Sequence, residues 1–597
     1  MILHCRRFYE ICICLTINVF LMRIVVETRE HNFEDEYNED LFIKPLIDGK
    51  LLAHFKFQTL YRKDIKSLRW ENKIELFPLS IKDLVATSDL DTLHFSLTKG
   101  NWNYRNWGYP IRSSPPGAQV RAQFSRHNEN LDRSWKLLVN SLAGIFCLSI
   151  ASADKRSLVT SKLLFARSIA LPNSTENVYY SNLPEETLCT ENLTPWKKLL
   201  PCHSKSGLAS LLNSVNLLKS SYSSLSIDIE PRACVIGGES IIGCERVELI
   251  LGITVVFNPL HQFEGKQSWS LAKLFGNTIQ RKCPLAQRSR IHVDITELDD
   301  RDKLYPTSYE FHTVPISPDI KDDRVYAVFD AVPALQANVT TTRPVNVGIK
   351  QAQIFKRPPA SSRPNVPIRL RTHIAGIGMT DGTIVATVTN MLDESVRVTY
   401  MDAIPHFLHV YKHTLMIRTR SGQELRPDRV TSGLSYDGPT LIEFSVVLPA
   451  NSEAQISYDF ERAFLRWTHF KPDANKGVLL SSTMIAIPLK AAKRRLIMHV
   501  GAAERDYNST TNIEIPEENE SIQIYAKPLL VILPTPDFSM PYNVICIVCT
   551  LLAAAFGSLH SMTTKKPIVH KRADTKDLKG PKMTATDKAK AETKKDK

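Results

Sequence analysis

The stretch LFIKPLIDGKLLAHFKFQTLY, residues 41–61, decides the class of fold that this chain adopts. Apolar and polar residues alternate on both sides of Asp48-Gly49, and this period of two is typical of strands with one buried face. An Asp-Gly pair between two such runs favours a tight β-hairpin. We therefore expect a sheet whose first two strands are joined at Asp48-Gly49.

The segments that follow the hairpin combine a few helices with many strands. Apolar residues recur at helical spacing in 134–150 and in 207–219, which predicts two helices. Short strand patterns separated by turn residues follow at 247–257, 383–389, 396–400, 409–419 and 441–448. A chain of 597 residues is too long for one core. We predict an α+β, mainly β, fold with an α/β-containing domain at 27–246 and a β-sandwich region at 247–536.

The N-terminus has the pattern of a signal peptide, which we place at residues 1–26. Arg6 and Arg7 precede an apolar run from Ile11 to Met22, as in a positive n-region followed by an h-region. Glu10 and the lack of a small-x-small cleavage motif leave an uncleaved anchor as the alternative. Either interpretation sends the following residues into the lumen of the endoplasmic reticulum.

A second apolar segment near the C-terminus predicts a single transmembrane helix at residues 541–562. Its centre, VICIVCTLLAAAFGSL at 544–559, carries no charge, and flanking residues extend it across a hydrocarbon core of about 30 Å. A buried core helix is the alternative, but a basic tail at 563–597 follows directly. The positive-inside rule then places that tail in the cytoplasm and the body in the lumen.

The tail also locates the excess charge of the chain. It holds more than half of the net charge of +13, so the body has no large positive excess and we expect no nucleic-acid partner. Lys594 and Lys595 stand fourth and third from the C-terminus, the pattern of a dilysine retrieval signal. The expected location is the endoplasmic reticulum membrane, with single-pass type I topology.

The cysteines and glycosylation sequons of the body agree with a lumenal location. Cysteines in an oxidising compartment are expected to form disulfides, although sequence alone leaves their connectivity open. The six in the body are Cys147, Cys189, Cys202, Cys234, Cys244 and Cys283. The sequons that we expect to accept glycans are Asn173, Asn338, Asn508 and Asn519, whereas Asn192 precedes Pro195 and is a poor acceptor.

The common enzyme motifs are missing from the sequence. It has no HExxH, GxSxG or Walker A motif, and outside the membrane segment no CxxC pair with zinc spacing. We therefore expect no catalytic residue, no metal and no cofactor. A Cys189/His203 dyad is the alternative, but a disulfide is the commoner fate of a lumenal cysteine.

Several longer blocks resemble the PIG-T family of GPI transamidase subunits. The first is CTENLTPWKKLLPC at 189–202, followed by Ser204-Lys205 and Gly207-Leu208, and a late block is LPTPDFSMPYNVIC at 533–546. Shorter matches begin at Gly100, Ser134, Trp269, Cys283 and Phe460. The resemblance runs from about residue 40 to 560.

The resemblance implies a non-catalytic scaffold in a complex that attaches GPI anchors to proteins. Its expected partners are a caspase-like catalytic subunit, other transamidase subunits, the GPI lipid and precursor proteins. It also implies that Cys189 forms an interchain disulfide with the catalytic subunit. Five body cysteines then remain, and Cys147, within an apolar helix, is our candidate for a buried free thiol. We expect Cys202 to pair with Cys283, or Cys234 with Cys244. The alternative function is that of a stand-alone lumenal transferase or protease.

Polar residues at the lumenal mouth of the span form a candidate contact site for the GPI lipid. Asp537, Ser539 and Asn543 lie at headgroup depth, where they can bind glycan hydroxyls or an ethanolamine ammonium. Asn475, in the turn at 472–477, joins them through the family match. Interface capping and turn formation are the alternative roles.

Overall fold

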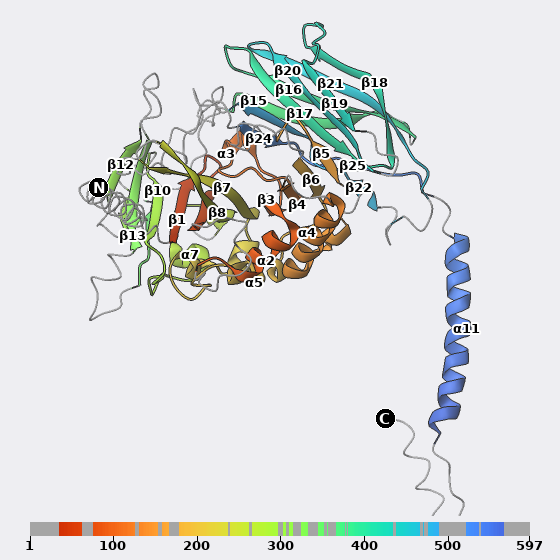
Figure 1. The fold of residues 1–597 in the computed structure, drawn as a ribbon, viewed down its shortest axis with the longest axis horizontal. Coiled ribbons are helices and arrows are strands. Elements are labelled where there is room, and N and C mark those ends of the chain that lie inside the picture. The colour runs from red at the N-terminus through yellow and green to blue at the C-terminus, as the bar shows by residue number, and fades with distance from the viewer. Residues whose placement is uncertain are drawn as a thin grey trace, which may run out of the picture. The chain divides into compact units, whose positions relative to one another are not determined.

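The fold is described from a computed structural model of the chain (Figure 1). The described residues are 35–61, 76–125, 130–152, 158–165, 178–236, 239–261, 265–296, 302–305, 310–314, 324–331, 344–351, 355, 366–376, 378, 380–433, 438–465, 470, 476–488, 521–535 and 539–565. The signal peptide at 1–26 lies outside them, as do Asn173, Asn338, Asn475, Asn508, Asn519, Asp537, Lys594 and Lys595. These expectations remain predictions.

The hairpin predicted around Asp48-Gly49 is confirmed. Strand β1 (Glu36–Pro45) pairs antiparallel with β2 (Leu51–Tyr61), with Leu41 opposite Phe55. Gly49 has a φ of +81°, a left-handed conformation that glycine adopts without steric cost. A residue with a side chain there would also collide with Leu260. The turn therefore depends on this glycine.

The hairpin lies inside an 11-stranded sheet. Strand β1 continues the sheet on its other side by pairing parallel with β10. The order across the sheet is β12 (Glu310–Val314), β13 (Arg324–Asp330), β10 (Arg288–Asp294), β1, β2, β8 (Glu239–Phe257), β7 (Tyr222–Ile236), β3 (Leu90–Lys99), β4 (Gly117–Phe124), β6 (Val178–Leu183) and β5 (Val159–Ser161). The boundary expected at residue 246 falls inside β8, and the sheet continues to β13.

Most of the helices gather on one side of this sheet and close its core (Figure 1). Helix α4 (Leu131–Phe146) confirms the first predicted helix, although it begins and ends earlier, because Asn130 caps its start. The second prediction, 207–219, is divided between a 3₁₀ turn, η3 (Leu208–Leu211), and α6 (Ser214–Leu218). The other helices of the body are α2 (Leu79–Ser88), α3 (Tyr104–Trp107), α5 (Thr190–Lys198), α7 (Leu271–Phe275), and the 3₁₀ turns η2 (Ser149–Ser152) and η4 (Pro259–His261).

Two further sheets enclose a second apolar core and confirm a mainly β fold. The four-stranded sheet has the order β15 (Ile368–Ala375), β16 (Asp381–Asn390), β21 (Ser452–Arg462), β18 (Leu408–Thr419). The five-stranded sheet has the order β19 (Arg429–Gly433), β20 (Thr440–Leu448), β17 (Val396–Ile404), β23 (Met484–Pro488), β24 (Ser521–Tyr525). Small sheets are formed by β11 (Lys303–Tyr305), β14 (Gly348–Lys350) and β9 (Trp269–Ser270), and by β22 (Val478–Leu479) and β25 (Leu530–Val531).

Buried polar contacts join the large sheet to the sandwich. The Glu443 carboxylate of β20 accepts hydrogen bonds from the Ser161 hydroxyl of β5 at 2.6 Å and from the Leu164 backbone N–H at 2.8 Å. The Tyr525 hydroxyl of β24 accepts one from Gln119 of β4 at 3.0 Å. Since a buried carboxylate without partners would be costly, these bonds fix how the sheet meets the sandwich.

Helix α11 (Ser539–Thr564) is the apolar C-terminal helix that the sequence predicted at 541–562. Among the described residues it is the one helix long and apolar enough to cross a membrane, and none of its side chains is buried. Its 26 residues give a length of about 39 Å, enough for a hydrocarbon core of about 30 Å. This fits a single-pass membrane protein.

A buried aspartate lies between the two sheets of the sandwich. Asp402 Oδ2 accepts hydrogen bonds from the hydroxyls of Tyr458 at 2.5 Å, Thr483 at 3.0 Å and Tyr400 at 3.3 Å. Burial is the largest influence on this group and raises the pKa of Asp402 from its usual 3.8 to about 6, against the opposing effect of the hydrogen bonds. The folded protein therefore holds this proton more tightly than the unfolded chain does.

We predict that Asp402→Asn gains stability relative to the wild type as the pH rises. Between about pH 4 and pH 6 the unfolded wild type loses the proton that the folded form retains, so its stability falls, whereas the amide does not titrate. The difference should reach on the order of 3 kcal/mol at neutral pH, because the pKa of Asp402 rises from 3.8 to about 6 on folding. Thermal unfolding of both proteins across this range measures it. The exposed Asp428→Asn is the control; a parallel trend in Asp402→Asn and wild type would contradict the assignment.

Candidate functional site

Helix α5 carries the cysteine that the sequence singled out. Cys189 is its N-cap residue, and the side-chain oxygen (Oδ1) of Asn192 accepts a hydrogen bond from the Cys189 backbone N–H at 2.9 Å. The same oxygen lies 2.9 Å from the Cys189 Sγ. Glu191 in the first turn and Lys197 and Lys198 in the last turn match the helix dipole. The start of α5 is therefore a defined structure and not a loose loop.

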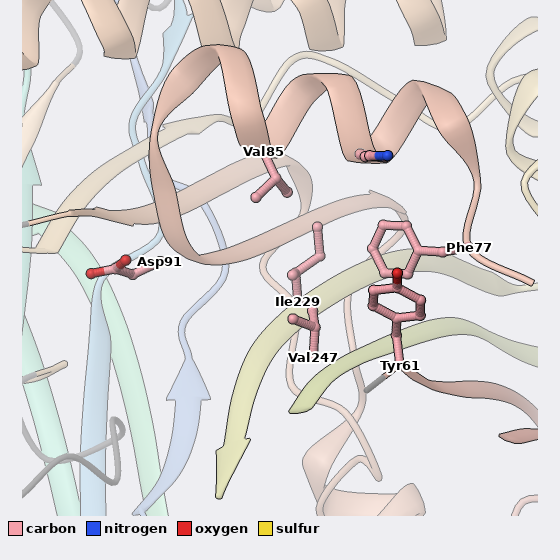
Figure 2. Close-up of a pocket in the computed structure, with 7 residues that line it drawn as sticks. Tyr61, Phe77, Val85, Asp91, Ile229 and Val247 are labelled. Atoms are coloured by element: carbon pink, nitrogen blue, oxygen red, sulfur yellow. The ribbon is translucent and has the colours of Figure 1, made fainter. Parts of the chain in front are cut away.

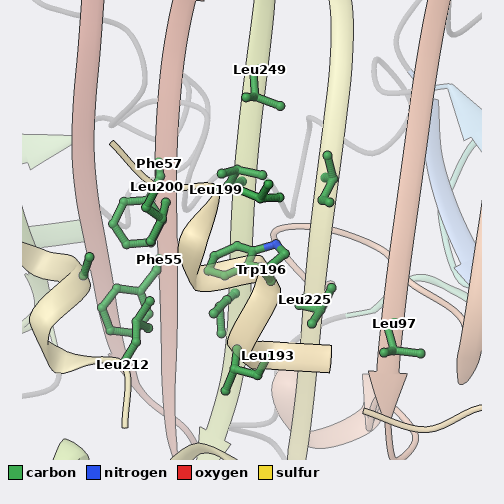
Figure 3. Close-up of a cluster of buried hydrophobic side chains, with 14 of the residues drawn as sticks. Phe55, Phe57, Leu97, Leu193, Trp196, Leu199, Leu200, Leu212, Leu225 and Leu249 are labelled. Atoms are coloured by element: carbon green, nitrogen blue, oxygen red, sulfur yellow. The ribbon is translucent and has the colours of Figure 1, made fainter. Parts of the chain in front are cut away.

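The Trp196 side chain holds α5 on the sheet. It is fully buried, and Figure 3 shows it among apolar side chains of β2, β7, β8 and the helix itself. Its Nε1–H donates to the Ser226 carbonyl of β7 at 3.2 Å. Its ring packs edge to face against the ring of Phe57 of β2, with 6.2 Å between the ring centroids. Burying an indole with its N–H paired is strongly favourable, so α5 is fixed to the centre of the sheet.

A disulfide anchors the chain after α5. Cys202 and Cys283, one of the two pairs expected from the sequence, are bonded with a Cα–Cα distance of 5.9 Å. The bond spans 81 positions of the sequence, and closing a loop of that size stabilises a fold by about 4.5 kcal/mol in the chain-entropy model. The Gly207 backbone N–H donates to the Arg281 carbonyl at 2.8 Å beside it. The segments around residues 202 and 283 are thus joined by both a disulfide and a backbone hydrogen bond.

A buried carboxylate completes the attachment. Glu39 of β1 is fully buried, and its Oε2 accepts hydrogen bonds from the Leu208 N–H at 2.9 Å and the Ser289 hydroxyl at 3.0 Å. Its Oε1 accepts a third from the Tyr37 hydroxyl at 3.0 Å. Burial raises the pKa of Glu39, while the hydrogen bonds oppose that rise. Glu39 therefore ties the segment after α5 to the sheet.

Two cysteines near α5 remain free. Cys189 is half-buried and has no disulfide, so the bonded pair 202/283 leaves it available. The prediction for Cys147 was wrong: it is free but exposed, because α4 ends at Phe146 and Cys147 is its C-cap with φ 54°. The Asn192 side-chain amide donates to the Phe146 carbonyl at 2.6 Å, which joins the end of α4 to the start of α5.

The alternative dyad of Cys189 and His203 is not formed. Cys189 precedes α5, whereas His203 follows it and its Nδ1 lies 3.1 Å from the Lys198 carbonyl. The two side chains therefore stand at opposite ends of the helix. Asn192, in contrast, is a residue whose role the sequence analysis missed. Its position three residues after the N-cap is the available signal, since that is where a capping-box partner stands.

The remaining cysteine pair lies at the tip of a hairpin. Cys234 belongs to β7 and Cys244 to β8, and these strands pair from Tyr222 opposite Val256 to Ile236 opposite Glu239. The pairing is irregular between Ala233 and Val235. A Cys234–Cys244 disulfide stays a prediction.

The described members of the predicted lipid-contact site lie on α11. Ser539 is its first residue and Asn543 lies one turn later, and both are exposed. Asn475 and Asp537 fall outside the described residues, but their neighbours come together within the body. Strand β22, just after residue 475, pairs with β25, a few residues before 537, with Val478 opposite Val531. The fold thus joins the two stretches of chain that lead to these residues.

A small hollow between α2, the end of β2 and the middle of β7 and β8 is lined by none of these residues. Figure 2 shows Val85 above Ile229 and Val247, with Phe77 beside Tyr61. The rings of Phe77 and Tyr61 are 5.9 Å apart. Only Lys82 and Asp91 add charge to the lining, so it offers no cluster of groups for chemistry.

Comparison with known proteins gives one consistent result. The family described as "Gpi16 subunit, GPI transamidase component" matches residues 17–259 and 244–590. The human GPI-anchor transamidase component PIGT is 35% identical, covering 89% of this chain and 90% of its own. The GPI transamidase component GPI16 of Saccharomyces cerevisiae is 27% identical over 90% of each chain. The PIG-T homolog of Schizosaccharomyces pombe is 26% identical, covering 89% of this chain and 90% of its own.

We predict that Gly207→Ala destabilises the protein far more than Gly422→Ala. Both glycines have left-handed φ angles, +67° and +87°, so both substitutions carry the backbone cost of about 1 kcal/mol. A Cβ at Gly422 meets nothing within 4 Å, whereas at Gly207 it would collide with the Glu39 carboxylate and lie 2.9 Å from the Cys283 Cβ. Gly207→Ala should therefore cost about 3 kcal/mol or more in the free energy of unfolding. Equal losses in denaturant titrations would contradict the close contact.

Proposed function

The chain belongs to the Gpi16 family of GPI transamidase components, and from that premise we propose that it is a non-catalytic scaffold of the transamidase complex. In this role it stabilises a caspase-like catalytic subunit and helps to present the precursor protein and the GPI lipid. The observation that carries the proposal is the free Cys189 thiol at the start of a helix that the sheet holds rigidly.

Cys189 has the properties that a covalent tether requires. It is half-buried, so a partner thiol can reach it. Cys202, the next cysteine in the sequence, is already bonded to Cys283 and therefore does not compete with a partner for the Cys189 thiol. A tether also needs a rigid base, because ordering a flexible segment on binding costs free energy. Trp196 and the disulfide supply that base. We propose that Cys189 forms an interchain disulfide with the catalytic subunit.

A scaffold role also suits the way in which the parts of the body are joined. The Glu443 and Tyr525 contacts bind the large sheet to the sandwich through buried hydrogen bonds. Such contacts fix one arrangement more than an apolar interface does. The separation of Cys189 from His203 supports the absence of a catalytic dyad at this helix.

The proposed lipid contact involves Asn475, Asp537, Ser539 and Asn543. It is supported by the pairing of β22 with β25, which brings the two leading stretches of chain together, and by the exposed positions of Ser539 and Asn543 at the start of α11. With α11 spanning the endoplasmic reticulum membrane and the body in the lumen, these polar groups meet the headgroup layer. There they can bind the glycan hydroxyls or the ethanolamine ammonium of the lipid.

We predict that Cys189→Ser abolishes the covalent link to the catalytic subunit. In non-reducing electrophoresis of native membranes, the wild type should show a partner-sized shift that reductant removes. The matched control is Cys147→Ser, because Cys147 is also free and lies near the same helix junction. The shift should persist in this control and vanish in Cys189→Ser. A shift that survives in Cys189→Ser, or is lost in Cys147→Ser, would contradict the assignment.

We predict that alanine at Asp537, Ser539 and Asn543 together lowers GPI transfer at least about tenfold, because several hydrogen bonds to a polar headgroup are lost. The subunits should still copurify. Thr550→Ala with Ser558→Ala is the control, since both hydroxyls donate to backbone carbonyls of their own helix. Transfer assays with a precursor and labelled GPI lipid measure the effect. Equal activity of both variants would argue against a lipid contact.

A further inference from the structure

The short strand that leads out of the body presents two large apolar side chains to the outside. Strand β25 and the residues after it read Leu530-Val531-Ile532-Leu533. Leu530 and Ile532 are 54% and 50% exposed, whereas Val531 and Leu533 are buried in the sandwich core. In an extended chain, residues two apart point to the same side. The exposed pair therefore forms one apolar face.

This pattern differs from that of several strands of the sandwich. A strand with one face in water normally places polar residues at its exposed positions. In the sandwich, β17 and β18 follow that rule, for example with Arg397, His409 and Arg418 at exposed positions. Leu530 of β25 and Ile532, the residue just after this strand, stand at the exposed positions instead. What sets this face apart from a single exposed valine is that two large apolar side chains stand side by side, which suits an apolar environment.

The apolar face is held rigidly and cannot turn inward. Val531 and Leu533 of the same stretch are buried in the sandwich core. Strand β25 also pairs with β22, with Leu479 opposite Leu530. The Leu480 backbone N–H donates to the Leu529 carbonyl at 2.8 Å. The two exposed side chains are therefore fixed to the outside of the body.

The short connecting chain limits how far this face can lie from the start of α11. Seven residue steps separate Ile532 from Ser539, the first residue of α11, and even a fully extended chain of that length reaches only about 25 Å. Helix α11 is longer than the hydrocarbon core, so its ends lie in the headgroup layers. The covalent connection therefore keeps Ile532 within about 25 Å of the first residue of α11.

From these observations we propose that Leu530 and Ile532 contact the membrane surface, inserting into the headgroup layer of the leaflet in which α11 begins. The body would then rest on the lipid through a second, non-covalent point besides its span. Two apolar side chains at a fixed position also limit the rotation of the body about the helix. This surface is distinct from the four polar residues of the proposed GPI contact, and it does not depend on that contact.

Site-specific photocrosslinking in the assembled complex in native membranes tests this. A diazirine-bearing amino acid replaces Leu530 or Ile532 and, as matched controls, the equally exposed Val215 and Val430. Leu551 within α11 serves as the positive control. We expect phospholipid adducts at residues 530, 532 and 551 to be about tenfold more abundant than at residues 215 and 430, because only the first three side chains would contact lipid.

Two outcomes would overturn the proposal. If residues 530 and 532 crosslink to another protein chain, a partner subunit covers the face. If they react with water as often as residues 215 and 430 do while residue 551 captures lipid, the face is simply solvated. Because neither result involves GPI transfer or Cys189, a failure here is distinguishable from a failure of the proposed function.

Discussion

The buried carboxylate of Glu39 joins the first strand of the sheet to the segment that begins at Cys189. Its oxygens accept hydrogen bonds from Leu208, Ser289 and Tyr37, which belong to η3, β10 and β1. A buried carboxylate is tolerated only where such partners are in place, so the three elements must assemble together. Gly207 leaves room for the approach, since any Cβ there would strike the carboxylate. The parallel pairing of β1 with β10 holds Glu39 and Ser289 opposite each other.

This constraint suits α5 as the base of the tether that we propose. The segment from residue 189 to 208 is attached by the Trp196 ring near its middle, by the disulfide of Cys202 and by Glu39 at its end. Its start is fixed by the Asn192 side chain, which bonds to both α4 and Cys189. The Cys189 thiol therefore lies at the start of an element that is attached to the sheet at several points. A disulfide formed there would transmit the position of the sheet directly to the partner subunit.

Much of the fold could be predicted from local pattern. The hairpin at Asp48-Gly49, helix α4 and the C-terminal apolar helix follow from periodicity and turn chemistry, which act over a few residues. The parallel partner of β1 could not be predicted, because β10 lies some 250 residues away and its pairing depends on tertiary contacts. Cys147 was placed wrongly for a similar reason: apolar spacing suggested a longer helix, but α4 ends with Cys147 in a left-handed conformation. Glu39 was missed because an acidic residue in a strand pattern looks exposed until its partners are known.

Cys202 and Cys283 form a disulfide at the base of the segment, and we propose that the free Cys189 bonds to another chain. Mass spectrometry of non-reduced peptides from the complex in native membranes measures this most directly. We expect the Cys202 peptide linked to the Cys283 peptide of the same chain, and the Cys189 peptide linked to a peptide from a different chain. A Cys189 peptide that is fully alkylated as a free thiol, or bonded to Cys147 or Cys202, would contradict the account.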